Sequence, residues 1–119
     1  MEVKVTNRTR SLENPLRVNN CESFFCRLKG LMFRNSIEMD AGLLMVQGSE
    51  SRANAAIHMF FVGMDLGVLW LDSSRKIVDK QLAKSWKPFY TPVSPAKYIL
   101  EIHPERLPEF ELGDILNFE

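Results

Sequence analysis

Alternation of apolar and polar residues predicts several short strands along this chain. Residues 3–5 and 16–18 alternate near the start, with a turn between them at Asn14-Pro15. Later apolar runs have the length of buried strands and are bordered by turn residues; they lie at 43–46, 56–62, 66–71, 98–102 and 115–118. Residues 72–75 have the composition of a turn, so 66–71 and the segment that begins at Lys76 should form a hairpin.

One helix is predicted over residues 21–29. Asn20 is a suitable N-cap, and Gly30 is suited to end the helix because glycine adopts left-handed backbone conformations at low cost. Apolar residues recur at helical spacing and are expected to face the core, with Arg27 and Lys29 outside this stripe. The members of the stripe are Cys21, Phe24, Phe25, Leu28, Leu31 and Met32.

The predicted elements indicate a mainly β fold. Seven or eight short strands and one helix in the N-terminal region favour a barrel-like or jelly-roll-like β sandwich. The chain has 119 residues, of which 45% are hydrophobic and 25% charged, and this composition is typical of a globular protein. We therefore expect a single domain over residues 1–119.

No membrane association is expected, since the sequence lacks an apolar run of roughly 18 residues and an N-terminal apolar signal core. Cys21 and Cys26 would lie on different faces of the predicted helix, too far apart for a disulfide. Free thiols fit a reducing compartment, so the predicted localisation is cytoplasmic.

Charge is unevenly distributed although the formal net charge is zero. Residues 75–97 carry six cations and one acid, interleaved with Trp86, Phe89 and Tyr90. This basic 75–97 surface is one candidate for docking a protein or a single-stranded nucleic acid. The neutral total charge and the acidic C-terminal region make nucleic acid the less favoured partner. A solvated strand and loop would explain the same residues.

Several segments, in order, resemble a known family. They are RLKGLMFR at 27–34, AGLLM at 41–45, IHMFFVGMDLGVLWLD at 57–72, YILEI at 98–102 and LGDILNF at 112–118. This set is similar to the domain of unknown function 192 family, also called uncharacterised protein family 0127. The resemblance implies a compact, mostly β barrel-like or jelly-roll-like domain with a helix before the GLM-x-R segment. It implies no activity, cofactor or partner.

This chain departs from the family pattern at three places. Cys26-Arg27 stands where many relatives have Glu-Arg, and residues 58–62 replace the more common Trp-Met-Lys-Asn-Thr. Asp65-Leu66-Gly67 stands where relatives often have Pro-Leu-Asp or Pro-Ile-Asp. Many bacterial relatives also resemble exported proteins, whereas this sequence shows no signal segment.

The residue types assign no function, and our hypothesis is a non-catalytic binding module for a small polar or anionic ligand. Arg34 follows an apolar segment and would clamp an anion with its guanidinium. Alternatively it would form a structural salt bridge with Glu101 or an acid such as Asp65, or cap a backbone carbonyl. His58 would contribute an imidazole, or be a satisfied histidine of the fold. The proposed cleft also includes Asp65 and is covered by an aromatic loop that contains Trp86 and Tyr90; that loop would otherwise cover a sheet edge.

An enzymatic alternative uses Asp65 and His58 as the acid and base of a small hydrolase or lyase. A nucleophilic thiol at Cys26 is disfavoured because this residue replaces the more usual acid. The histidines and cysteines lack the spacing of metal ligands, so no metal site is expected. No cofactor is expected either, since the sequence has no glycine-rich phosphate loop or dinucleotide motif.

Overall fold

Seven strands form one sheet in the computed structural model, which describes residues 2–119 except for the side chain of Phe24. The strand order is β5-β4-β6-β3-β2-β1-β7. All neighbouring strands are antiparallel except β2 and β3, which run parallel. The strands are β1 (Glu2–Asn7), β2 (Leu16–Cys21), β3 (Ala41–Ser51), β4 (Leu66–Leu71), β5 (Ile77–Ala83), β6 (Ala96–Ile102) and β7 (Leu116–Phe118).

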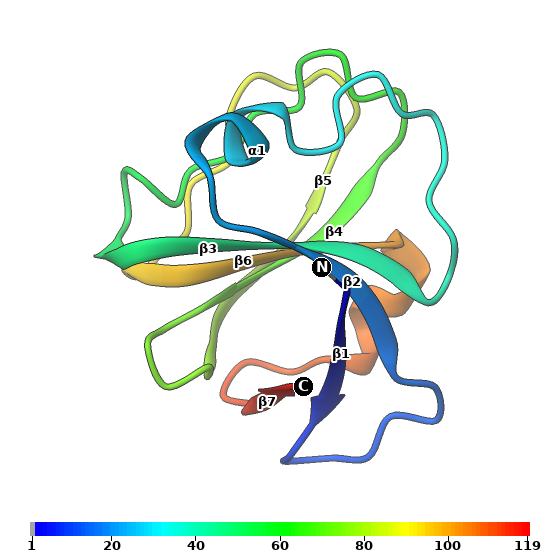
Figure 1. The fold of residues 1–119 in the computed structure, drawn as a ribbon, viewed down its shortest axis with the longest axis vertical. Coiled ribbons are helices and arrows are strands. Elements are labelled where there is room, and N and C mark those ends of the chain that lie inside the picture. The colour runs from blue at the N-terminus through cyan, green and yellow to red at the C-terminus, as the bar shows by residue number, and fades with distance from the viewer. Residues whose placement is uncertain (1) are drawn as a thin grey trace.

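The sheet curls into a half-barrel whose two edge strands meet at one end. Lys76 and Ile115 form an antiparallel bridge there, and the neighbouring Ile77 N–H donates to the Asp114 carbonyl at 2.8 Å. At the opposite end the helix α1 (Phe24–Lys29) and the long connections gather above the sheet (Figure 1). The predicted mainly β, barrel-like fold with an early helix is confirmed.

Both faces of the central strands are buried, which explains why they appear in the sequence as continuous apolar runs. All six residues of β4 are buried. Alternate residues of β3, β4 and β6 enter two separate cores. Leu43, Met45 and Ile99 face α1 and the long connections, whereas Leu44 and Leu100 face the core on the other side.

The predicted start of the helix was wrong by several residues. Ser23, not Asn20, is the N-cap, and its hydroxyl accepts a hydrogen bond from the Cys26 N–H at 3.1 Å. Asn20 and Cys21 belong to β2, because their backbones pair with β3. Gly30 ends the helix as predicted, at φ +48°, and its N–H donates to the Cys26 carbonyl.

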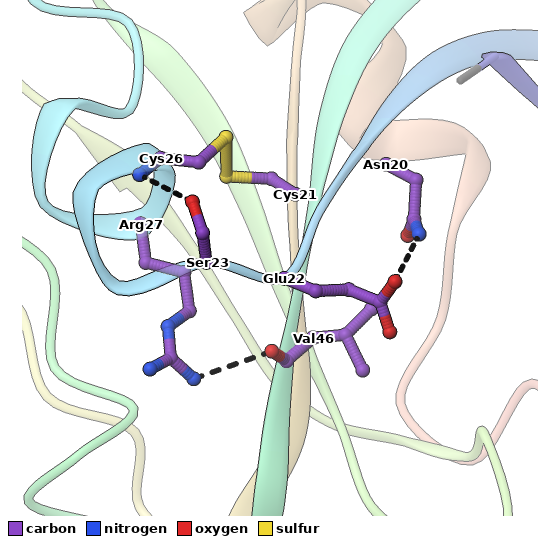
Figure 2. Close-up of a disulfide and its surroundings, with 7 residues drawn as sticks. All are labelled: Asn20, Cys21, Glu22, Ser23, Cys26, Arg27 and Val46. Carbon is purple, nitrogen blue, oxygen red and sulfur yellow. Dashed lines mark hydrogen bonds between the residues drawn. A yellow bond between two sulfur atoms is a disulfide. The ribbon is translucent and has the colours of Figure 1, made fainter.

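The prediction that Cys21 and Cys26 are free thiols was also wrong. The two residues form a disulfide, with their Cα atoms 5.6 Å apart (Figure 2). The separation estimated from a continuous helix does not apply, since Cys21 ends a strand and Cys26 lies in α1. The bond ties the short helix to the sheet. Cytoplasmic localisation therefore stays a prediction, without the support of free thiols.

Residues 56–62 do not form the strand that their apolar character predicted. Ile57 makes a single β-bridge with Tyr90, after which Met59 and Val62 close a turn through the Val62 N–H. Phe61 has φ +61°, which a strand cannot accommodate. The segment is apolar because it covers the core at Ala55, Ile57, Met59 and Val62, not because it lies in the sheet.

The turn-rich stretch after β6 contains a 3-10 helix, η1 (Pro104–Glu109), packed on the second core. Its Arg106 side chain is buried and bonds to the carbonyls of Asn14 and Met39 as well as to Glu109. The β4–β5 hairpin was correctly predicted, with the Asp72 N–H donating to Lys76. Across residues 2–119, no helix has the length and apolar character needed to cross a membrane.

Candidate functional site

A cavity of about 440 Å³ lies between α1 and the sheet. Strand alternation decides which side chains reach it, because Met45 and Gln47 of β3 and Ile99 and Glu101 of β6 share the face that α1 covers. The helix end contributes Arg27 to Leu31, and the segment after β3 contributes Asn54, Ala56 to His58 and Val62. The result is a cavity whose wall is about equally polar and apolar.

Glu101 is the acid of this cavity. Its side chain is fully enclosed, since the residue is only 3% exposed, and burial raises the pKa of its carboxyl to about 7. Its Oε1 atom is buried without a hydrogen-bond partner. Gly30 lies over this carboxyl: a Cβ placed on Gly30 would be 3.7 Å from Oε1.

His58 supplies the second unpaired polar atom. Its Nε2 is 2.8 Å from the Leu28 carbonyl oxygen, which requires Nε2 to carry the proton and donate. Nδ1 is then an acceptor in the neutral ring, and it is buried without a partner. Two buried unpaired polar atoms on one cavity are unusual, because nearly all such groups in folded proteins are hydrogen-bonded.

Gln47 and Arg27 complete the polar wall. Gln47 is buried and its Nε2 donates to the Asn54 carbonyl at 2.6 Å, which links β3 to the loop that follows it. Arg27 is half-buried and its Nη1 donates to the Val46 carbonyl at 3.3 Å (Figure 2). Its guanidinium therefore stays at the cavity rather than extending away from the core.

Among the residues named from the sequence, His58 lines this cavity and Arg34 does not. Arg34 is exposed, and its backbone carbonyl accepts the Gly63 N–H at 2.8 Å. Asp65 also lies outside the cavity lining: Oδ1 accepts the Ser85 N–H, and Oδ2 pairs with Lys84 at 3.4 Å. The hydrogen bond from Ser85 and the nearby Lys84 charge lower the pKa of Asp65 despite partial burial.

Trp86 and Tyr90 are not equivalent parts of a lid. Trp86 is exposed and its ring lies against Phe61, with 4.9 Å between centroids. Tyr90 is buried, bridges Ile57 through both backbone hydrogen bonds, and accepts the Lys84 N–H at its hydroxyl. The loop that contains them packs on the core, and the described cavity lining draws no residue from it.

The cations of the basic 75–97 surface are spread over the molecule. Lys80 donates to the Phe110 carbonyl near η1, and Arg75 lies over the Phe118 ring at the closed end of the half-barrel. Lys84 and Lys87 follow the far end of β5. Arg75 and Lys97 lie over the same Tyr98 ring. Docking of a partner on this surface stays a prediction.

Sequence reasoning missed Glu101, Gln47 and Arg27 as members of a common site. The available signal was a polar residue on an otherwise apolar strand face: Glu101 follows Ile99, and Gln47 follows Met45, at a spacing of two. No cluster of three or more potential metal-ligating His, Cys, Asp or Glu side chains occurs in residues 2–119.

Comparison with known proteins places this geometry in a family. A model of the DUF192 family, described as "Uncharacterized ACR, COG1430", matches residues 4–118. The chain belongs to this family. The sequence-based resemblance is thus confirmed, and it brings no specific function.

Relatives match over most of their length. The UPF0127 protein TK1120 of Thermococcus kodakarensis is 39% identical over 116 residues, covering 96% of this chain and 72% of the relative. A UPF0127 protein of Pyrococcus abyssi is 30% identical and is covered to 92%, as is this chain.

Two crystal structures share the fold. One, from Sinorhizobium meliloti and provisionally named a transcription regulator, has a TM-score of 0.85 at 21% identity, covering 98% of this chain and 92% of the other. The second, a Novosphingobium aromaticivorans protein of unknown function, has a TM-score of 0.81 at 17% identity, covering 98% and 84%. Identities this low support the fold alone.

Proposed function

We propose that this protein binds a small polar molecule in the cavity between α1 and the sheet. The observation that carries the proposal is the pair of buried unpaired atoms, Oε1 of Glu101 and Nδ1 of His58, in two residues that line the same cavity. A ligand that satisfies both atoms would recover the cost of leaving them unpaired. The volume of about 440 Å³ lies toward the lower end of the usual range for small-molecule sites.

The charges define the chemistry of the ligand. A ligand hydrogen-bond donor, such as a hydroxyl or amine, suits His58 Nδ1, while Glu101 can donate when protonated or accept when ionised. Arg27 and Lys29 favour an acceptor or anionic group on the same ligand. The preferred class is therefore a small molecule that combines a donor group with an anionic or acceptor group, such as a hydroxy acid.

Ligand screening with matched variants tests this proposal. Small hydroxy acids, amino acids and sugars are titrated against the wild-type protein, with thermal shift and calorimetry as readouts. Glu101→Gln and Arg27→Ala should each weaken binding about tenfold or more, since each loses a charge-assisted hydrogen bond in a partly dry site. Glu38→Gln and Arg34→Ala are the matched controls, because both residues are exposed and outside the cavity lining.

Two results would contradict ligand binding in this cavity. One is the absence of any stabilising compound in these three classes. The other is a ligand whose affinity falls with Arg34→Ala and not with Arg27→Ala, which would instead support the cleft near Arg34, His58, Asp65, Trp86 and Tyr90 that the sequence suggested.

Acid–base catalysis is a second candidate function. A carboxyl with a pKa near 7 can both give and take a proton near neutral pH, and Glu101 shares its cavity with His58. In a hydrolase or lyase of this kind Glu101 would take the part that the sequence assigned to Asp65. Turnover of a bound ligand, lost in Glu101→Gln while binding persists, would support catalysis. Binding without product formation would restrict the protein to the ligand-binding function.

A further inference from the structure

Six large aromatic side chains are exposed on segments around α1. These segments belong to the end of the molecule where α1 and the long connections gather (Figure 1). The side chains are 38% to 79% exposed. They come from three segments, residues 24–34, 57–64 and 84–90, and we call this surface the aromatic face. Its members are Phe25, Phe33, Phe60, Phe61, Trp86 and Phe89. Exposed apolar groups gathered in this way mark interaction surfaces.

The rings contact one another across the three segments. Phe61 lies 5.4 Å from Phe33 and 4.9 Å from Trp86, and Phe60 meets Phe89 edge-on at 6.0 Å, all between centroids. A shallow groove of about 500 Å³ runs between the rings and α1, and its wall is almost entirely apolar. The aromatic face is thus one continuous apolar surface rather than a set of separate rings.

Backbone geometry holds part of this surface in place. Phe33, Phe61 and Trp86 have φ near +60°, which is uncommon for large residues and recurs at functional positions. Hydrogen bonds fix these turns: the Phe33 N–H donates to the Phe61 carbonyl at 2.6 Å, and the Trp86 N–H to the Met59 carbonyl at 3.0 Å.

The three segments that form the aromatic face carry a net positive charge. They contain five cations and no acid: Lys29, Arg34, Lys84 and Lys87 are exposed, whereas Arg27 is held at the cavity by the Val46 carbonyl. Asp65 borders the face, and it is paired with Lys84. A partner that complements the aromatic face would have an apolar layer beneath a negatively charged surface. An anionic lipid leaflet has this composition.

We propose that the aromatic face docks the protein peripherally on anionic membranes. The aromatic rings would enter the boundary between headgroups and acyl chains, with the cations at the phosphate level. A twofold dimer is disfavoured because it would bring the same cations of two copies together. Single-stranded nucleic acid is disfavoured because the rings pack against one another and the groove lacks a row of cations for a phosphate backbone.

This inference departs from the expectation that no membrane is involved. That expectation rested on the lack of a long apolar run, and a peripheral surface assembled from three separated segments produces no such run. The cavity adjoins the aromatic face, because Leu28, Lys29 and His58 line both the cavity and the groove. The two proposals are tested separately, since ligand titrations are made without vesicles.

Vesicle co-sedimentation tests the proposal. The wild-type protein should sediment with phosphatidylcholine vesicles that contain phosphatidylserine, and much less with phosphatidylcholine alone. Phe33→Ser and Phe89→Ser should each weaken this binding about tenfold, and Arg34→Ala about fivefold. Leu112→Ser and Lys4→Ala are matched controls, because both residues are exposed and lie outside the three segments. On binding, Trp86 emission should shift to the blue, whereas the buried Trp70 contributes little change.

Three outcomes would overturn membrane docking. The first is equal or absent sedimentation with the two vesicle types. The second is concentration-dependent dimerisation that Phe33→Ser abolishes, without vesicle binding. The third is binding to a single-stranded oligonucleotide that the same variants weaken, again without vesicle binding. The far-ultraviolet circular dichroism of each variant, measured in parallel, identifies any loss of fold.

Discussion

Glu101 lies directly beneath Gly30, with its Oε1 atom 3.7 Å from the position that a Cβ on Gly30 would occupy. Gly30 ends α1 and Glu101 belongs to β6, so the end of the helix lies close to the sheet at this cavity. Burial of the carboxyl raises its pKa, and its Oε1 atom has no hydrogen-bond partner.

Stability should fall as pH rises through the range in which Glu101 ionises. The folded carboxyl has a pKa of about 7 against 4.5 in the unfolded chain, so between these values the folded state binds more protons. The contribution of Glu101 then decreases by about 3 kcal/mol from the acid to the alkaline side. Glu101→Gln cannot ionise and should lose this pH dependence.

Urea unfolding at a series of pH values from about 5 to about 8 measures this effect. Glu38→Gln, at an exposed position, should retain the wild-type dependence of the free energy of unfolding on pH. If the free energies of the wild type and Glu101→Gln changed in parallel with pH, the carboxyl would not be buried as described.

The disulfide should contribute modestly to stability because it closes a short loop. Cys21 and Cys26 are five residues apart, so the entropic estimate for removing the bond is about 2 kcal/mol. The helix α1 has only six residues and cannot be stable alone. Removal of the disulfide should therefore also increase proteolysis between residues 24 and 34.

Reduction of the wild-type protein should therefore lower the urea midpoint, as should the Cys21→Ala/Cys26→Ala double variant. The double variant itself should be insensitive to reductant, and this serves as the control. An unchanged wild-type midpoint on reduction would contradict the assigned stabilising role.

Replacing Arg106 by lysine should destabilise the fold. The planar guanidinium reaches Glu109 and the carbonyls of Asn14 and Met39 together, and an ammonium lacks this forked arrangement. The buried acceptors left unpaired should cost about 2 kcal/mol. Thermal unfolding of Arg106→Lys, compared with Arg8→Lys at an exposed position, measures the difference. Equal melting temperatures for the two variants would refute this role.

Asp114 should stabilise the packing of the C-terminal segment against the end of β1. It is buried, which opposes ionisation, but the Glu111 N–H, Asn7 and Arg10 all donate to it and lower its pKa overall. This stability is present above the unfolded pKa of 3.8 and is lost as pH falls through the depressed folded value.

Asp114→Asn should cost about 3 kcal/mol near neutral pH, since it removes the charge and part of the acceptor capacity. Denaturant unfolding measures the loss, and Asp40→Asn at an exposed site is the control. A cost no larger than that of Asp40→Asn would show that these bonds contribute little.

Local sequence patterns predicted secondary structure correctly where a pattern is compatible with only one backbone conformation. Alternation identified β1 and β2, and continuous apolar runs identified β3, β4, β6 and β7. Gly30 identified the helix end because few other residues adopt its backbone conformation. The 56–62 segment was misassigned because burial alone makes a chain apolar, whether it pairs in a sheet or covers a core.

The apolar stripe of the helix was misinterpreted for the same reason. Phe25 and Leu28 were expected in the core and are 79% and 50% exposed. Helical spacing shows that residues share a face, but not what that face contacts. The aromatic face could not be predicted, because three segments separated in sequence form it.

The sequence by itself determined the strands, the hairpin, the end of the helix and the mainly β class, since these depend on local spacing and backbone preference. Tertiary structure alone decided that Cys21 meets Cys26, that Glu101 faces His58's cavity rather than solvent, and that Arg34 lies outside it. The physical reason is that burial and pairing depend on strand order and curvature. Both arise from contacts between residues far apart along the chain.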